Sequence, residues 1–161
     1  MNPWQAFSAR AFWLISRSAL AGYRRFPIFG SLRAAVGIIR QGDRYLLIQR
    51  NDGRGFSFPG GLAWPWESEE RAVRREITEE TGLEVLSAEL DFKYHSGRDV
   101  QCDISAFKVT VTGQLHGSWE GTPVWVNGNA MPERILPSQA AIVERIASYE
   151  RQSAQQTTAG I

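Results

Sequence analysis

One charged segment, residues 68–82, constrains the fold of this chain more than any other. Ser68 is suited to cap a helix, and Glu69 and Glu70 suit its positive first turn. Gly82 is suited to end the same helix in the left-handed conformation. Because strand-like runs precede and follow it, the helix is expected to lie against a sheet.

The strand-like runs alternate apolar and polar residues or are rich in β-branched residues. They are residues 32–40 and 44–50, joined at the hairpin signal "QGD", and then 56–61, 83–95, 100–112 and 123–126. An amphipathic helix is expected over 138–150. The pattern predicts an α+β sandwich.

Length and composition point to one globular domain. The chain has 161 residues, 43% of them hydrophobic and 22% charged, which allows a single core of ordinary size. Cys102 is the single cysteine and is expected to be a buried structural thiol, which suits a reducing cytoplasm. The run "AFWLI" near the start is too short to span a bilayer or to form a signal-peptide core.

Positive charge is concentrated at the start of the chain. No acidic residue occurs before Asp43, although the net charge is only +1. Residues 1–30 are expected to be a separate extension with an amphipathic helix, 31–150 the domain, and 151–161 a flexible tail. The extension could pack on the domain, form a homodimer, contact an anionic membrane peripherally, or act as a transit peptide. No stable nucleic acid partner is expected, because the rest of the chain is acidic.

Three glutamates share one face near the C-terminal end of the central helix: Glu76, Glu79 and Glu80. Each like-charged pair at this spacing costs roughly 0.2–0.5 kcal/mol, and the helix dipole adds to the cost. Carboxylate oxygens are ligands for hard cations such as Mg²⁺ or Mn²⁺, which would turn repulsion into coordination. A solvated helix face stabilised by neighbouring arginines is the competing interpretation.

The spacing of the whole stretch "GGLAWPWESEERAVRREITEETGL" favours the cation-binding interpretation. From Gly61 to Leu83 it resembles the Nudix box, and every fixed position of that motif is met. The resemblance implies an α/β/α sandwich with a mixed central sheet. It also implies Mg²⁺- or Mn²⁺-dependent hydrolysis of a nucleoside diphosphate linked to another group, such as a nucleotide sugar, ADP-ribose or a nucleoside triphosphate.

The resemblance also implies roles for individual residues. Glu79 and Glu80 correspond to metal ligands, and Glu76 to a further ligand or to the base for the attacking water. Gly60 matches a glycine whose carbonyl reaches the metal, and only a residue without Cβ allows such an approach. Arg75 and Glu67 correspond to a pair that holds the loop to the helix.

Three residues outside these positions complete the expected site. Glu120, in a glycine-rich turn between two strands, is expected to be an extra metal ligand or base. Trp64 is the first candidate for stacking on a nucleobase, and Arg54 for contacting a phosphate. The alternative to an enzyme is a non-catalytic module of the same fold that senses a nucleotide or docks at a membrane.

Overall fold

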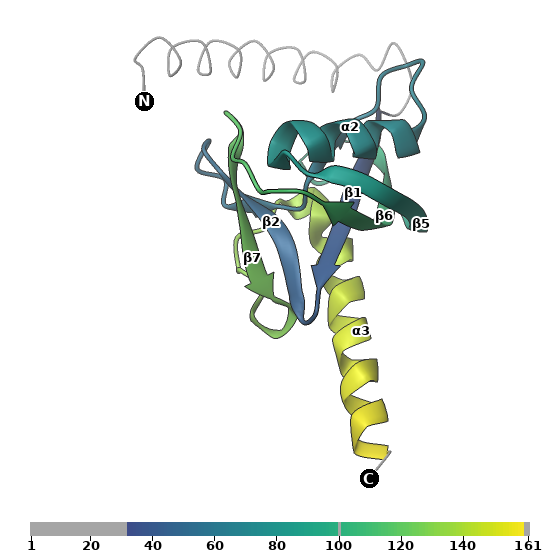
Figure 1. The fold of residues 1–161 in the computed structure, drawn as a ribbon. Helices are drawn as coiled ribbons and strands as arrows, with labels where there is room; N and C mark the ends of the chain where they lie inside the picture. Colours follow the sequence, from purple (N-terminus) through teal and green to yellow (C-terminus); the bar gives the residue numbers. More distant parts are fainter. Residues whose placement is uncertain (1–31, 100, 160–161) are drawn as a thin grey trace.

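The computed structural model describes residues 32–99 and 101–159. The helix expected within residues 1–30 lies outside the described residues, as do positions 100, 160 and 161. Two helices enclose a twisted sheet, with α2 on one face and α3 on the other (Figure 1). The chain therefore folds as an α/β/α sandwich.

The sheet has seven strands in the order β3-β2-β1-β6-β5, with β4 added to β1 and β7 added to β2. β1 and β6 are parallel, and every other pairing is antiparallel, so the sheet is mixed as expected. The strands are β1 (Leu32–Gln41), β2 (Arg44–Arg50), β3 (Phe56–Ser57), β4 (Gly60–Leu62), β5 (Glu84–Ser96), β6 (Cys102–Thr112) and β7 (Gly121–Asn127).

The helix α2 (Glu69–Thr81) forms as its sequence predicts. The Ser68 hydroxyl accepts a hydrogen bond from the Arg71 N–H at 3.2 Å, and Gly82 adopts a left-handed φ of 71°. The apolar side of α2 packs on the sheet through three fully buried side chains. These are Ala72, Val73 and Ile77.

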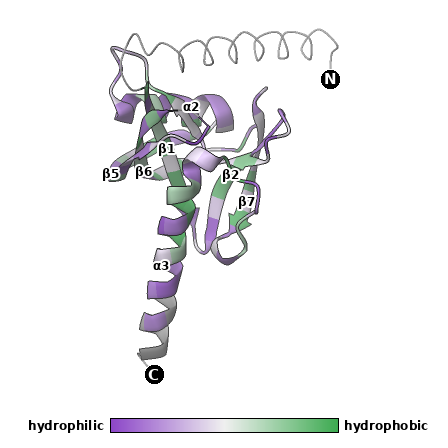
Figure 2. Ribbon diagram, turned by 180° about the vertical axis from the view of Figure 1, so that it is seen from behind, coloured by the Kyte–Doolittle hydropathy of each residue, from purple (hydrophilic) through white to green (hydrophobic). Residues whose placement is uncertain are grey.

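The second helix, α3 (Ala140–Ala159), covers the opposite face of the sheet. Ile142 and Ile146 are fully buried there, and Figure 2 shows apolar residues on the part of α3 that lies beside the central strands. Two single-turn 3-10 helices, Gly128–Ala130 and Pro137–Gln139, come between β7 and α3. In the described part of the chain, no helix is long and apolar enough to cross a bilayer.

Two details differ from or extend the sequence analysis. The helix was expected to end near Glu150, whereas α3 continues to Ala159 because no glycine or proline interrupts "RQSAQQTTA". Cys102 is buried, and this burial raises the pKa of its thiol to about 11. The thiol is therefore a core side chain and not a reactive one.

Candidate active site

The deepest carboxylate of the site belongs to Glu80, near the end of α2. Only 3% of this residue is exposed, and its Oε2 accepts a hydrogen bond from the Gly60 N–H at 2.8 Å. Burial raises the pKa of Glu80 well above its usual value. The Gly60 hydrogen bond opposes that rise, and the neighbouring carboxylates of Glu120 and Glu76 add to it. Glu80 is therefore a buried carboxylate with other acids as neighbours.

Glu76 lies one helical turn before Glu80 and faces the start of β4. A Cβ atom on Gly61 would lie 2.5 Å from the Glu76 Oε1, so the absence of a side chain there makes room for the carboxylate. Burial raises the pKa of Glu76, although Arg75 opposes the rise. Glu120 and Glu79 raise it further. These influences show that the acids lie close enough to interact.

Glu120 approaches Glu76 and Glu80 from a distant part of the sequence, the turn before β7. It immediately precedes β7, and its carbonyl oxygen accepts a hydrogen bond from the Asn51 N–H at 2.9 Å. Gly121 pairs with Arg50 in the β2–β7 register, which fixes this turn beside β2. Glu120 is 40 residues from Glu80 in sequence, yet its charge raises the pKa of both Glu76 and Glu80.

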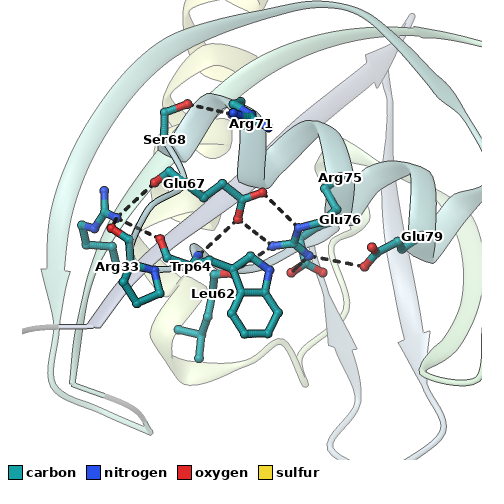
Figure 3. A network of polar contacts seen from close by, with 10 residues as sticks. Arg33, Leu62, Trp64, Glu67, Ser68, Arg71, Arg75, Glu76 and Glu79 are labelled. Atoms are coloured by element: carbon teal, nitrogen blue, oxygen red, sulfur yellow. Dashed lines mark hydrogen bonds and ion pairs between the residues drawn. The ribbon is translucent and has the colours of Figure 1, made fainter. Parts of the chain in front are cut away.

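Arg75 connects the loop, the helix and two of the acids (Figure 3). It donates to both Glu67 carboxylate oxygens, at 3.1 and 3.0 Å, and to the Leu62 carbonyl at 3.2 Å. Its Nη1 contacts Glu76 at 2.7 Å and Glu79 at 3.3 Å. One guanidinium nitrogen thus lies between these two carboxylates, and the hydrogen bonds raise the pKa of Arg75.

The structure brings some of the expected ligands together and holds one apart. Glu76, Glu80 and Glu120 interact beside Gly60, whereas the Glu79 side chain is 60% exposed and pairs with Arg75. Within the described residues, no three acidic, histidine or cysteine side chains are already arranged to hold an ion. Arg75 explains this geometry, because it holds Glu76 and Glu79 as its own counterions.

The donor set nevertheless fits a hard divalent cation. Glu80 is a buried carboxylate with other carboxylates as neighbours, and a cation would relieve the repulsion that raises the pKa of Glu80. All of these donors are oxygens, the ligands that Mg²⁺ and Mn²⁺ accept. Gly60 lies against the Glu80 carboxylate through its N–H.

The expected substrate residues, Trp64 and Arg54, are both exposed. Trp64 is 53% exposed, its ring stacks on Trp66, and the Arg75 guanidinium lies 5.8 Å from its centroid. Arg54 pairs with Asp52 at 2.9 Å, and its side chain is 45% exposed. Both side chains are therefore accessible from solvent.

Arg50 and Arg33 were missed by the sequence analysis. Asp52 pairs with Arg50 at 2.7 Å, and Glu120 and Glu80 help to raise the pKa of Arg50 although its burial opposes the rise. Arg33 donates to the backbone carbonyls of three loop residues. They are Trp64, Pro65 and Glu67. Strand arginines carry no local signal of such contacts, which depend on which strands become neighbours.

Comparison with known proteins agrees with the architecture. A family model described as the NUDIX domain matches residues 31–146. The 8-oxo-dGTP diphosphatase of Haemophilus influenzae is 30% identical over 130 residues, which are 71% of this chain and 90% of that protein. The Bacillus subtilis protein YtkD is 48% identical over 61 residues, and the match spans only 38% of each protein.

A solved structure shows the same fold. The MutT Nudix hydrolase from Burkholderia pseudomallei superimposes with a TM-score of 0.64 at 21% identity, and the match covers 71% of this chain and 96% of that one. At this identity the likeness concerns the fold alone. It confirms the expected α/β/α sandwich with a mixed sheet.

Proposed function

We propose that this chain, which belongs to the Nudix hydrolase family, hydrolyses a phosphoanhydride bond in a nucleoside triphosphate or another nucleoside diphosphate derivative. One observation carries the proposal. Glu80, Glu76 and Glu120 interact with one another beside the Gly60 backbone, although no salt bridge neutralises Glu80 among the described contacts. Such crowding of acids is costly unless the site binds positive charge.

We assign the binding of Mg²⁺ or Mn²⁺ to Glu80, Glu76 and Glu120, with the Gly60 carbonyl as a further donor. Glu79 would join this set only after leaving Arg75. When bound, such a cation neutralises the phosphate oxygens and stabilises the leaving group. Family membership supports a divalent cation in general terms, and the choice between these two metals is part of the proposal.

The chain's own residues then position the reactants. A water oxygen forms a bond to phosphorus, the anhydride P–O bond breaks, and the water proton passes to a carboxylate oxygen. Glu76 and Glu120 are the candidates for this base, because both lie at the site and neither is as enclosed as Glu80. Arg75 acts as a positioning residue, because it holds Glu76 at 2.7 Å while pairing with Glu67 on the loop.

The substrate we propose first is an oxidised purine nucleoside triphosphate. The relative that aligns over most of its length is an 8-oxo-dGTP diphosphatase, and that activity motivates this choice. Trp64 offers an exposed ring on which a base can stack, and Arg54 offers a cation for a phosphate. Both roles are proposals, as are the catalytic roles of the acids.

The test is hydrolysis of a substrate panel with detection of released phosphate or pyrophosphate. The panel contains 8-oxo-dGTP, dGTP, ADP-ribose and a nucleotide sugar, each with Mg²⁺ and with Mn²⁺. Glu80→Gln should lower kcat by about 10²–10⁴-fold for the preferred substrate. Glu70→Gln is the matched control on the exposed first turn of α2 and should retain activity. No turnover of any substrate, or an undiminished Glu80→Gln variant, contradicts the proposal.

A further inference from the structure

We propose that the protein has a second ligand site, a cavity between the sheet and α3 that binds a small organic molecule carrying a phosphate group. The cavity has a volume of about 430 Å³, which is within the range of small-molecule sites. Its lining comes from four strands, β1, β2, β5 and β6, and from α3. This inference concerns binding alone and is independent of the proposed hydrolysis.

The cavity lies on the face of the sheet that α3 covers. Ile38 and Tyr45 line it, and both belong to the core cluster that includes Ile142 and Ile146 of α3. Glu80 belongs to α2, which packs on the opposite face. Figure 1 shows α3 continuing past the hairpin between β1 and β2. The sheet therefore separates this cavity from the candidate active site.

Two cationic side chains line the cavity from neighbouring strands. Arg40 belongs to β1 and Lys108 to β6, and their side chains are 43% and 54% exposed. These strands are paired, with Ile38 opposite Lys108, and adjacent strands lie about 4.8 Å apart. Because Ile38 and Arg40 share a face of β1, both cations can contact one bound anion.

Local contacts hold the two cations at the cavity without using all of their donors. Arg40 donates to the Gly42 carbonyl at 2.7 Å and lies 3.3 Å from Glu150. Lys108 lies 3.1 Å from Asp91. A guanidinium has five N–H donors and an ammonium has three, so each cation retains donors for a ligand.

Two hydroxyl groups lie beside the cations. Ser87 and Thr110 line the cavity and are direct partners in the β5–β6 register. Among the described residues, neither hydroxyl takes part in a hydrogen bond. Arginine, lysine, serine and threonine are the side chains that proteins use to contact phosphate oxygens. This combination therefore favours a phosphate group over a neutral ligand.

The remaining lining favours an organic group attached to that phosphate. Ile38, Tyr45 and Val109 line the same cavity and offer apolar surface. A phosphate ion alone would leave most of the 430 Å³ unfilled. A nucleoside monophosphate has both the phosphate and the organic group, so AMP is the probe we choose.

Glu89 is an acid in the lining, and it opposes an anionic ligand. It lies opposite Lys108 in the β5–β6 register. The other acids beside the two cations already have partners, because Asp91 pairs with Lys108 and Glu150 with Arg40. Removing the charge of Glu89 should therefore tighten anion binding, whereas removing that of Arg40 should weaken it.

The experiment is an NMR titration of the isotope-labelled full-length protein with AMP, adenosine or inorganic phosphate. EDTA is present, so that no divalent cation links the ligand to the acids of the candidate active site. AMP should shift the backbone amide signals of Ser87, Lys108 and Thr110. Adenosine and inorganic phosphate should each bind about tenfold more weakly than AMP.

Four variants test the individual contacts, and their spectra also show whether each is folded. Arg40→Gln should weaken AMP binding by about tenfold and Thr110→Val by about threefold. Glu89→Gln should tighten it by about threefold. Arg44→Gln is the matched control and should leave binding unchanged, because Arg44 lies 5.8 Å from the Trp125 ring on the face that α2 covers.

Several results would overturn the proposal. Equal affinities of Arg40→Gln and Arg44→Gln, no binding of AMP, or shifts confined to α2 and β4 would show that the cavity is not the site. Adenosine that binds as tightly as AMP would show that the phosphate is not recognised. Inorganic phosphate that binds as tightly as AMP would show that the organic group is not.

Discussion

Arg75 changes the expected behaviour of the glutamates on α2. The spacing of the three acids in the sequence predicts that a cation relieves their repulsion. The structure places the Arg75 guanidinium between Glu76 and Glu79 instead, and leaves Glu80 facing Gly60. The acid without an arginine partner is therefore also the most buried one. At the scale of residues, the site contains two kinds of acid. Glu76 and Glu79 have Arg75 as a counterion, whereas Glu80 has the Gly60 N–H.

The two adjacent glycines at the start of β4 should respond differently to alanine. Gly61→Ala should lower kcat at least tenfold and change stability little, because the new methyl group displaces only the flexible Glu76 carboxylate. Gly60→Ala should cost roughly 1–3 kcal/mol of unfolding free energy, because Gly60 has a φ of 146° and its missing Cβ faces the β1 backbone. Urea unfolding and steady-state kinetics on both variants separate the effects. Equal losses of stability in the two variants would contradict this prediction.

At the scale of elements, α2 is bounded by its caps. Ser68→Ala should lower the unfolding free energy by about 1 kcal/mol, because the Arg71 N–H loses its acceptor. Ser68→Asp retains an acceptor and a favourable charge at the helix start, so it should be nearly neutral. The measurement is the urea midpoint at a constant m-value. An unchanged midpoint for Ser68→Ala would mean that another group satisfies this N–H.

Asp91 connects β5 to β6 and α3. Its side chain, only 6% exposed, contacts Lys108 at 3.1 Å and accepts from the Tyr149 hydroxyl at 2.7 Å. Burial opposes ionisation, but these hydrogen bonds lower the pKa of Asp91 below its usual value. A lowered folded-state pKa stabilises the fold above the unfolded-state pKa, and this stabilisation is lost as the pH falls through the folded-state value.

Asp91→Asn should therefore cost about 1–3 kcal/mol at pH 7, and the difference from the unaltered protein should shrink as the pH falls below about 4. Asp103→Asn is the control, because Asp103 forms an exposed pair with His95 and should contribute less than about 1 kcal/mol. Unfolding free energies measured between pH 3 and pH 7 test both. A difference that persists unchanged at pH 3 would show that the charge of Asp91 is not responsible.

At the scale of the whole molecule, the site forms where three separate parts of the chain meet. β4 pairs with β1, and α2 packs against both strands. The turn before β7 lies near them because β7 pairs with β2. This arrangement predicts that a divalent cation binds the folded protein and not the unfolded chain. Folding and cation binding should then be linked.

Mg²⁺ or Mn²⁺ at about 100 times its Kd should raise the unfolding free energy by about 2.7 kcal/mol, and the Tm by about 5–10 °C. Differential scanning calorimetry with the metal, and again after chelation, measures the shift. Glu80→Gln should abolish it, whereas Glu70→Gln should preserve it. A shift of the same size in Glu80→Gln would place the cation elsewhere on the protein.

Local chemistry in the sequence was sufficient to predict α2, the hairpin at "QGD" and the helix faces. Caps, turns and periodicity act over a few residues, so Ser68, Gly82 and the spacing of Glu76 and Glu80 could be interpreted directly. Their spacing also indicated the family. For the same reason, the extent of α3 was underestimated, because its last turns are polar and have no local stop signal before Gly160.

Contacts between distant residues were decided only by the tertiary structure. The β2–β7 pairing brings Glu120 to Glu80, and Arg33 reaches the carbonyl of Trp64 because β4 pairs with β1. The division of the α2 acids between Arg75 and the Gly60 backbone likewise depends on where β4 meets the helix. Residue spacing specifies which side chains share a face, but the charges and burial they encounter there depend on which strands become neighbours.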